Sequence, residues 1–206
     1  MNLIDSLIKD NWLKTPLIIE AFRKIKRADF LPEGITELAE LNEAIPIGFG
    51  QTISQPLVVA FMIEQLNPRP GHKILDIGSG SGWTTALLSY IVGSKSEGKV
   101  IALEIVPELK EFGEENASKY DFIKKGIAEF ISIDGSFGYL KKAPYDGIIA
   151  SASSQIIPEP WKEQLKIGGR IVAPVKSSIW VLEKKSEREF IEAEYPGFSF
   201  VPLVSK

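Results

Sequence analysis

The sequence predicts an α/β fold, in which a mostly parallel sheet ends in antiparallel C-terminal strands and is preceded by an N-terminal helical cap. From Lys73 onward, short runs of β-forming residues alternate with amphipathic segments, a pattern typical of parallel strands joined by crossover helices. Before Lys73, apolar residues recur at helical spacing. Near the C-terminus, two strand-like runs are separated only by a short charged stretch, which indicates antiparallel edge strands.

Length and composition indicate one domain. The 206 residues, 44% of them hydrophobic, are enough for one well-buried α/β core and hardly enough for two. No internal repeat, low-complexity tract or linker divides the chain. We therefore expect a single domain over residues 1–206, with a helical cap and a polar loop in residues 1–72 and the sheet in residues 73–206.

The cap is predicted to be helical from its apolar spacing and its helix-start signals. One helix is indicated by apolar residues that share a face, namely Leu3, Ile4, Leu7 and Ile8. Thr15-Pro16 resembles an N-cap followed by a first-turn proline. The stretch from Gly48 to Pro56 is predicted as a loop by its composition, and Pro56 begins another helix.

The sheet is predicted from apolar runs that follow the cap. The expected strands cover residues 74–77, 100–103, 130–133, 147–150 and 170–175, with late strands at 179–183 and 198–204 on either side of the charged stretch 184–189. The tail is short, so we expect it to leave little material for a C-terminal lid.

Composition also excludes several classes of function. A net charge of -3 supplies no broad basic field, so no nucleic-acid or membrane partner is predicted. The chain has no cysteine, which removes disulfides, thiolate metal sites and thiol nucleophiles. Its one histidine, His72, is expected in an exposed turn, and no metal site is predicted. Neither a secretion signal nor a membrane-spanning run is visible, so we expect a cytoplasmic protein.

A glycine-rich turn follows the first predicted strand of the sheet. Gly78, Gly80 and Gly82 stand between the strand at 74–77 and an apolar helix. Glycine allows the backbone to approach a ligand closely, and a helix N-terminus offers free amides. Trp83 stands where a dinucleotide fingerprint requires glycine or alanine, which disfavours nicotinamide and flavin cofactors. By itself the pattern also fits a tight strand-to-helix turn.

Acidic residues end the next two predicted strands. Glu104 follows an apolar strand, where a carboxylate can accept hydrogen bonds from two ribose hydroxyls, although a solvated acid would have the same pattern. Asp134 and Gly135 end the third strand, as a clamp for an adenine amino group would require. Because parallel strands end at one edge of the sheet, we expect these residues to lie together there.

This order of motifs resembles the class I S-adenosylmethionine-dependent methyltransferases, which have a Rossmann-like sheet. The resemblance implies that the methionine part of the cofactor is held by Asp76, Gly78, Ser79, Gly80, Ser81 and Gly82. It implies that Glu104 binds the ribose and that Asp134 with Gly135 binds the adenine. A purely structural role for Asp76 at the end of its strand is the alternative.

The class of methyl acceptor is indicated by two further segments. The fourth strand ends in Ala150-Ser151-Ala152-Ser153-Ser154 rather than in an Asn/Asp-Pro-Pro-aromatic turn, which disfavours methylation of base or glutamine nitrogens. The chain resembles protein-L-isoaspartate O-methyltransferases over most of its length, in collinear order. The matching segments are Arg27-Ala28-Asp29-Phe30-Leu31-Pro32, Ile47-Gly48-Phe49-Gly50-Gln51-Thr52-Ile53-Ser54-Gln55-Pro56, Asp134-Gly135-Ser136-Phe137-Gly138, Ala143-Pro144-Tyr145-Asp146, Ile157-Pro158, the segment 164–175 and Phe200-Val201-Pro202-Leu203.

The resemblance implies methyl transfer from S-adenosylmethionine to the α-carboxylate of L-isoaspartyl residues in damaged proteins or peptides, with S-adenosylhomocysteine as product, as a first step of protein repair. A carboxylate is already ionised at neutral pH, so no general base is required. We expect the four residues Thr52, Ile53, Ser54 and Gln55 to fold over the methyl donor, with the Ser54 hydroxyl hydrogen-bonded to the acceptor carboxylate as the catalytic group. The alternative for Ser54 is an N-cap role for the next helix.

Two departures from the family pattern leave other functions open. Lys176-Ser177-Ser178 stands where many relatives have a glycine, and Leu57-Val58-Val59 stands where some have histidines or an aromatic residue. One alternative is a carboxylate O-methyltransferase for a dedicated peptide or small molecule. Another is a cofactor-binding adaptor without turnover. We expect a monomer in each case.

Overall fold

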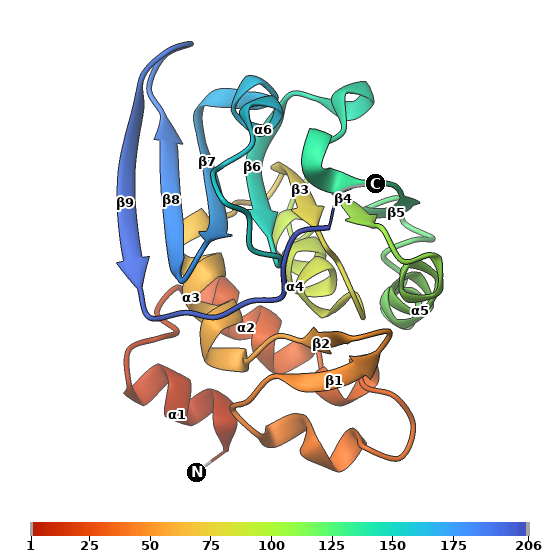
Figure 1. Ribbon diagram of the computed structural model, residues 1–206. Helices are drawn as coiled ribbons and strands as arrows, with labels where there is room; N and C mark the ends of the chain where they lie inside the picture. Colours follow the sequence, from red (N-terminus) through yellow and green to blue (C-terminus); the bar gives the residue numbers. More distant parts are fainter. Residues whose placement is uncertain (1, 205–206) are drawn as a thin grey trace.

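Within residues 2–204, which the computed structural model describes, one seven-stranded sheet forms the centre of the molecule (Figure 1). Its strand order is β5-β4-β3-β6-β7-β8-β9. Neighbouring strands from β5 to β7 run parallel, whereas β8 is antiparallel to β7 and β9 is antiparallel to β8. The predicted fold class is therefore confirmed. The ends of the predicted domain, residues 1 and 205–206, lie outside the described residues.

Along the chain, the elements form first the cap, then the hairpin and then the sheet. The cap consists of α1 Leu3–Lys9, α2 Pro16–Lys24, η1 Arg27–Phe30 and η2 Thr36–Glu40, the hairpin of β1 Ile45–Gly48 and β2 Gln51–Ile53, followed by α3 Pro56–Leu66. The sheet strands are β3 Lys73–Ile77, β4 Lys99–Glu104, β5 Ala128–Ser132, β6 Tyr145–Ala150, β7 Leu165–Val175, β8 Ser178–Lys184 and β9 Phe190–Pro196. The connecting helices are α4 Trp83–Val92, α5 Pro107–Ser118, η3 Gly135–Phe137, η4 Leu140–Lys142 and α6 Glu159–Glu163.

Alternating side chains of the central strands bury two apolar layers. In β4, Val100 and Ala102 join the core cluster that includes the cap and the helices α3 and α4, whereas Ile101 and Leu103 join the cluster on the other face around Trp161. A strand covered on both faces has a continuous hydrophobic sequence, because neither face is left to solvent. Burial of both faces explains why these strands are visible as apolar runs.

The chain reverses direction across the sheet beside β3. It proceeds from β3 through β4 to β5 at one edge and then returns to β6, which pairs with β3 on its other side. The loops after β3 and β6 therefore leave in opposite directions. Such a switch point opens a crevice at the carboxyl ends of parallel strands, where ligands of open α/β folds bind.

The sequence Gly48 to Pro56, predicted as a loop, instead contains the second strand of a hairpin. Ile45 pairs with Ile53, Pro46 with Thr52 and Gly48 with Gln51, and the turn residues Phe49 and Gly50 have left-handed backbone angles. The prediction was wrong because these strands are very short and bury one face only, so their alternation is hard to distinguish from a polar loop.

The C-terminal prediction was also partly wrong. The second late strand is β9, Phe190–Pro196, whereas residues 198–204 lie outside the sheet strands and form only an isolated bridge between Pro202 and Ser153. Lys184 belongs to β8 and is buried. Its ammonium can be buried there because it donates hydrogen bonds to the carbonyls of Lys162 and Leu165. After β9 the chain crosses the lower part of the view, and its last described residues lie near β4 (Figure 1).

Candidate active site

The crevice at the switch point contains a cavity, here called the glycine-turn cavity. It lies at the carboxyl ends of β3, β4, β5 and β6 and is also bordered by the hairpin and the C-terminal segment. Its lining residues are Gln51, Thr52, Ile77, Gly78, Gly80, Leu103, Glu104, Ile105, Ile133, Gly135, Ser151, Ala152 and residues 201–204. Of the residues predicted to bind a cofactor, the structure brings Thr52, Gly78, Gly80, Glu104 and Gly135 to this lining.

The glycine turn is held in a conformation that other residues rarely adopt. Gly78, Gly80 and Gly82 have φ angles of 75°, 52° and 86°, in the left-handed region. The amides of Gly78 and Ser79 donate to the carbonyl of Leu103, which fixes the turn against the end of β4. A side chain at Gly82 would meet the carbonyl of Gly113 at 2.6 Å, so this position also requires glycine for close helix packing.

Glu104 joins the glycine turn to the end of β4. Its Oε2 accepts from the amide of Gly80 at 2.8 Å, and its Oε1 accepts from the amides of Ile105 and Val106 at 2.9 and 3.1 Å. The residue is 6% exposed and lines the glycine-turn cavity. The backbone thus fixes the orientation of a carboxylate at a position where a ligand hydroxyl could reach the remaining lone pair of its Oε2.

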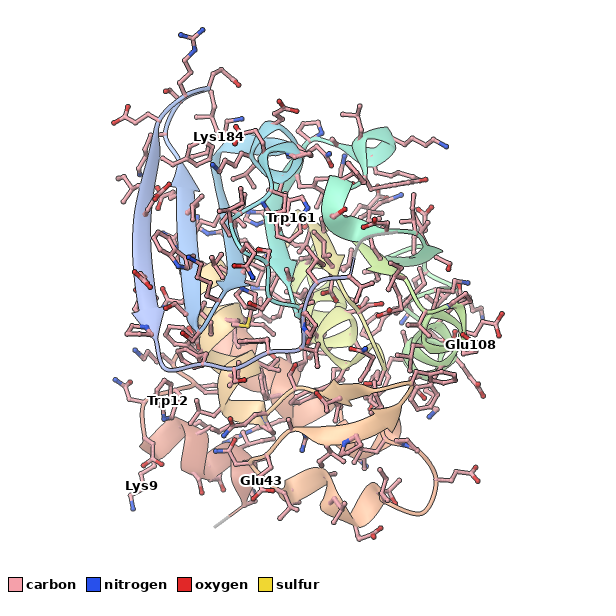
Figure 2. All side chains as sticks on the ribbon, viewed as in Figure 1. Lys9, Trp12, Glu43, Glu108, Trp161 and Lys184 are labelled. Atoms are coloured by element: carbon pink, nitrogen blue, oxygen red, sulfur yellow. The ribbon has the colours of Figure 1, made fainter. Side chains whose placement is uncertain are left out.

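The turn after β5 is shaped by Gly135. Asp134 accepts from the amide of Ser136 at 2.8 Å and caps η3, and it is not part of the cavity lining, whereas Gly135 is. The indole Nε1 of the buried Trp161, labelled in Figure 2, donates to the carbonyl of Gly135 at 2.9 Å. The sequence pattern carries no signal for this hydrogen bond between Trp161 and the turn.

Asp76 is fully buried and therefore outside the lining of the cavity. Its Oδ2 accepts from the hydroxyl of Thr85 at 2.6 Å, and its Oδ1 has no hydrogen-bond partner among the described residues. Burial raises the pKa of Asp76 to about 7, the Thr85 hydroxyl opposes this shift, and the charge of Glu104 adds to it. Ser79, Ser81 and Gly82 are likewise buried and outside the lining.

A second cavity, here called the Ser54 cavity, adjoins the first. It has a volume of about 520 Å³ and shares Thr52, Ser151 and Val201 with the glycine-turn cavity. Its other lining residues are Ala44, Ser54, Gln55, Val58, Gly197, Phe198, Ser199 and Phe200. Within the described chain, every residue of this lining is uncharged at neutral pH, and four of them carry hydroxyl groups.

Ser54 directly follows β2 and is half-buried in this cavity. The N-cap of α3 is Gln55, and the free amide of Leu57 in the first turn is bound by the side-chain oxygen of Asn42 at 3.0 Å. The alternative role of Ser54 as the helix cap is therefore wrong. Among the described residues, none forms a hydrogen bond with the Ser54 hydroxyl, which leaves that hydroxyl available to a ligand. Ile53 is buried on the inner side of the hairpin.

The C-terminal segment lines both cavities, so the expectation that the short tail leaves little material over the site was wrong. The amide of Ser153 donates to the carbonyl of Val201 at 2.8 Å, and the amide of Leu203 donates to the carbonyl of Ser153 at 2.7 Å. Phe198 stacks on Phe61 of α3, with ring centroids 5.5 Å apart. These contacts hold the segment across the carboxyl edge of the sheet. The only sequence signal was the family-like Phe200-Val201-Pro202-Leu203.

Membrane-spanning helices and metal-binding groups of side chains can be assessed for residues 2–204. None of the helices in this range has the length and apolar character required to cross a bilayer. No group of three or more histidine or acidic side chains in the same range is arranged to hold a metal ion. His72 is half-buried near the opposite edge of the sheet, where its Nδ1 accepts from the amide of Arg69, and burial lowers its pKa.

The sheet order and the ligand crevice beside its glycine turn define a class I methyltransferase fold. Solved structures share it: a Plasmodium falciparum protein described as a candidate protein-L-isoaspartate O-methyltransferase, in complex with S-adenosyl-L-homocysteine, superposes with a TM-score of 0.88 at 22% identity over 99% of both chains. A solved protein-L-isoaspartate O-methyltransferase gives a TM-score of 0.87 at 25% identity, over 98% of this chain and 65% of the other.

Sequence comparison identifies the family. The model of the protein-L-isoaspartate(D-aspartate) O-methyltransferase (PCMT) family matches residues 1–206, and the chain belongs to that family. The protein-L-isoaspartate O-methyltransferase of Methanopyrus kandleri is 38% identical over 211 aligned residues, which cover 99% of this chain and 90% of the relative. Protein-L-isoaspartate O-methyltransferase 2 of Archaeoglobus fulgidus is 42% identical over 90% of this chain and 84% of the relative. The predicted family resemblance is therefore confirmed.

Proposed function

We propose that this protein transfers a methyl group from S-adenosylmethionine to the α-carboxylate of L-isoaspartyl residues in damaged proteins and peptides, and so begins their repair. Membership of the PCMT family supports this reaction. The single structural observation that carries it is the uncharged Ser54 cavity that adjoins the glycine-turn cavity. One cavity suits a nucleotide-like methyl donor, and the other suits an acceptor that needs no protein base.

The residues of the glycine-turn cavity fit the methyl donor. When bound, S-adenosylmethionine supplies an electrophilic methyl group on its sulfonium. Glycines at positions 78 and 80 allow the backbone to approach a ligand, and a methyl group at Gly135 would collide with Ile77 at 2.6 Å, so a closely fitted surface is built here. In the proposal, Gly78 to Gly82 with Asp76 hold the methionine part, Glu104 holds the ribose, and Asp134 with Gly135 holds the adenine.

Asp76 would contribute to that site from behind the turn, because it is buried and bonded to Thr85. Ser79 and Ser81 would likewise act through the turn that they form. Thr52 borders both cavities, whereas Ile53 packs inward. Gln55 donates to the carbonyl of Asn42 and is committed to holding the loop. These contacts support a loop that folds over the methyl donor. In this loop, Thr52 and Ser54 would be the residues that contact the bound substrates directly.

The acceptor class follows from the chemistry of the Ser54 cavity. An alcohol or amine acceptor would need a base to remove its proton, and no residue in the described lining supplies one. A carboxylate is already ionised near neutral pH, and hydroxyl groups can donate hydrogen bonds to it. Ser54 is the proposed catalytic residue, because its unengaged hydroxyl can hold the carboxylate oxygen in line with the methyl group. Such positioning contributes up to about 7–11 kcal/mol in favourable systems.

The test is methyl transfer from labelled S-adenosylmethionine to two peptides that differ only in carrying L-isoaspartyl or L-aspartyl at one position. Transfer to the isoaspartyl peptide alone supports the proposal. Transfer to both peptides, or to one dedicated sequence regardless of linkage, would instead support a dedicated carboxylate methyltransferase. Cofactor binding without transfer to either peptide would support an adaptor without turnover.

The proposed function includes an oligomeric state, a cellular location and a class of partners. We propose a monomer that acts in the cytoplasm on isoaspartyl-containing proteins and has no nucleic-acid partner. The net charge of -3 supports the last point, because nucleic-acid binding draws on a basic surface. Light scattering after size exclusion tests the monomer, cell fractionation tests the location, and an electrophoretic shift assay at low salt tests nucleic-acid binding.

A further inference from the structure

Arg27 is a buried cation that binds four backbone carbonyls. It lies in η1 and is 6% exposed. Its Nη1 donates to the carbonyls of Ala39 and Leu41 at 3.2 and 2.9 Å, and its Nη2 donates to those of Glu43 and Ser54 at 2.7 and 3.2 Å. Two of these bonds are shorter than 3.0 Å, so the guanidinium is fixed in place.

The four carbonyls belong to the two ends of the hairpin that borders the cavities. Residues 39–43 lead into β1, and Ser54 directly follows β2. The guanidinium therefore ties the chain entering the hairpin to the chain leaving it. Asn42 adds a second connection, since its carbonyl accepts from the side chain of Gln55 and its side chain accepts from the amide of Leu57. The position of Ser54 is thus set at the base of the hairpin.

The same guanidinium connects the hairpin to the glycine turn. Its central carbon lies 5.4 Å from the ring centroid of Trp83, which is the first residue of α4 and directly follows Gly82. Trp83 in turn packs edge-to-face against Phe22 of α2 at 5.6 Å. One rigid side chain therefore contacts both the segment that carries Ser54 and the helix start behind the glycine turn.

Stability alone does not account for a charge at this position. In the described part of the chain, the Nε of Arg27 and the Nε1 of Trp83 are buried without hydrogen-bond partners, and no carboxylate there forms a salt bridge with the guanidinium. Burial lowers the pKa of Arg27 to about 10, with Glu40 opposing the shift, so the group remains a cation at neutral pH. A buried charge without an ionic partner is a weak source of stability compared with apolar packing.

We propose that Arg27 is a positioning residue for Ser54, which holds the Ser54 segment in register with the glycine turn so that the hydroxyl and the methyl donor are aligned. This inference rests on the proposed function in assigning the acceptor contact to Ser54. It predicts that disturbing Arg27 lowers turnover through Ser54 far more than it lowers the affinity for the cofactor. The β1–β2 hairpin is the element through which the effect is transmitted.

The first test compares Arg27→Lys with Arg170→Lys. Lysine keeps the charge, but one ammonium cannot replace a planar fork that binds four carbonyls. Arg170 is a matched control, because it also donates to a backbone carbonyl, that of Gln65, while pairing with Glu183 outside both cavities. Arg27→Lys should lower kcat for the isoaspartyl peptide about 100-fold, with affinity for S-adenosylhomocysteine changed less than about threefold. Equal kcat losses in the two variants would overturn the inference.

A double-mutant cycle separates positioning from general destabilisation. If Arg27 acts through the Ser54 hydroxyl, Arg27→Lys should lower kcat less than about threefold once Ser54→Ala has removed that hydroxyl. A loss of about 100-fold in both backgrounds would show that the two residues act independently and would refute the inference. All variants are measured below their unfolding temperatures, as established by calorimetry.

Amide hydrogen exchange provides a readout that does not depend on activity. Residues 45–54 should exchange at least about tenfold faster in Arg27→Lys than in Arg170→Lys, because the hairpin base is released only in the former. Unchanged exchange there overturns the inference even if turnover falls. If the wild type fails to methylate isoaspartyl peptides, the proposed function fails, while the exchange result still decides whether Arg27 fixes the hairpin. Should Arg27→Lys not fold, Trp83→Phe replaces it. This variant weakens the contact against which the guanidinium packs but keeps its four hydrogen bonds, so a smaller increase in the exchange of residues 45–54 over the wild type is expected, and no increase overturns the inference.

Discussion

Glu104→Gln separates two expected roles of the Glu104 carboxylate, which are to hold the glycine turn and to bind the cofactor. In the structure the carboxylate accepts three backbone hydrogen bonds, from Gly80, Ile105 and Val106. Glutamine has nearly the same shape, and its remaining oxygen can keep the bonds to Ile105 and Val106. Its amide nitrogen would then face the amide of Gly80, where one donor meets another. The substitution therefore removes a charge-assisted hydrogen bond from the glycine turn without creating a cavity.

The expected magnitudes follow from that geometry. A hydrogen bond to a charged group contributes about 1.5–3 kcal/mol, so the free energy of unfolding without cofactor should fall by about that amount. If the carboxylate also accepts from the ribose hydroxyls, loss of its charge weakens cofactor binding by a similar amount. That corresponds to an increase in the dissociation constant of about 10- to 100-fold.

Urea unfolding measures the first role, and calorimetric titration with S-adenosylhomocysteine measures the second. Glu183→Gln is a suitable control, since Glu183 pairs with Arg170 and Lys185 away from both cavities. A dissociation constant within twofold of the wild type would remove Glu104 from the cofactor site. Lowered stability with unchanged affinity would leave Glu104 only the role of holding Gly80.

Three further substitutions test the site. Ser54→Ala should lower kcat about 100-fold in the peptide methylation assay while urea unfolding is nearly unchanged, because Asn42 and not Ser54 binds the amide of Leu57 in the first turn of α3; an active variant would contradict the catalytic role. Gly135→Ala should reduce stability by about 1–3 kcal/mol in urea unfolding and weaken cofactor affinity in calorimetry, because its Cβ would lie 2.6 Å from Ile77; wild-type values for both would contradict the close fit. Asp76→Asn tests the raised pKa of about 7. The folded wild type retains a proton that the unfolded chain releases, so its stability relative to the variant should fall between about pH 4 and pH 7, by at most about 1.4 kcal/mol per pH unit, and then level off; a pH-independent difference in urea unfolding would contradict the shift.

The sheet could be predicted from the sequence because burial on two faces leaves a clear signal. The apolar run at 100–103 became β4, whose side chains alternate between two core clusters. The strand β9 lacked this signal, since it is an edge strand with glutamates at positions 192 and 194. The strand was predicted at residues 198–204 instead, because that segment is more apolar. Some of their apolar side chains are covered by other elements, as the ring of Phe198 is by the ring of Phe61 in α3.

The two halves of the site differ in how far the sequence could locate them. The glycine-turn cavity is built by residues at or close after the ends of strands, so finding the strands also finds Gly78, Glu104 and Gly135. The Ser54 cavity is bordered by Ser54 and by the segment 197–201, which are far apart in the chain and are brought to one cavity by the path of the chain after β9. No local periodicity or motif spacing in the sequence predicts that these two segments line the same cavity. Without the structure, the tail could therefore be associated with the acceptor side only through its family-like residues, and its part in lining both cavities follows from the hydrogen bonds that join Val201 and Leu203 to Ser153.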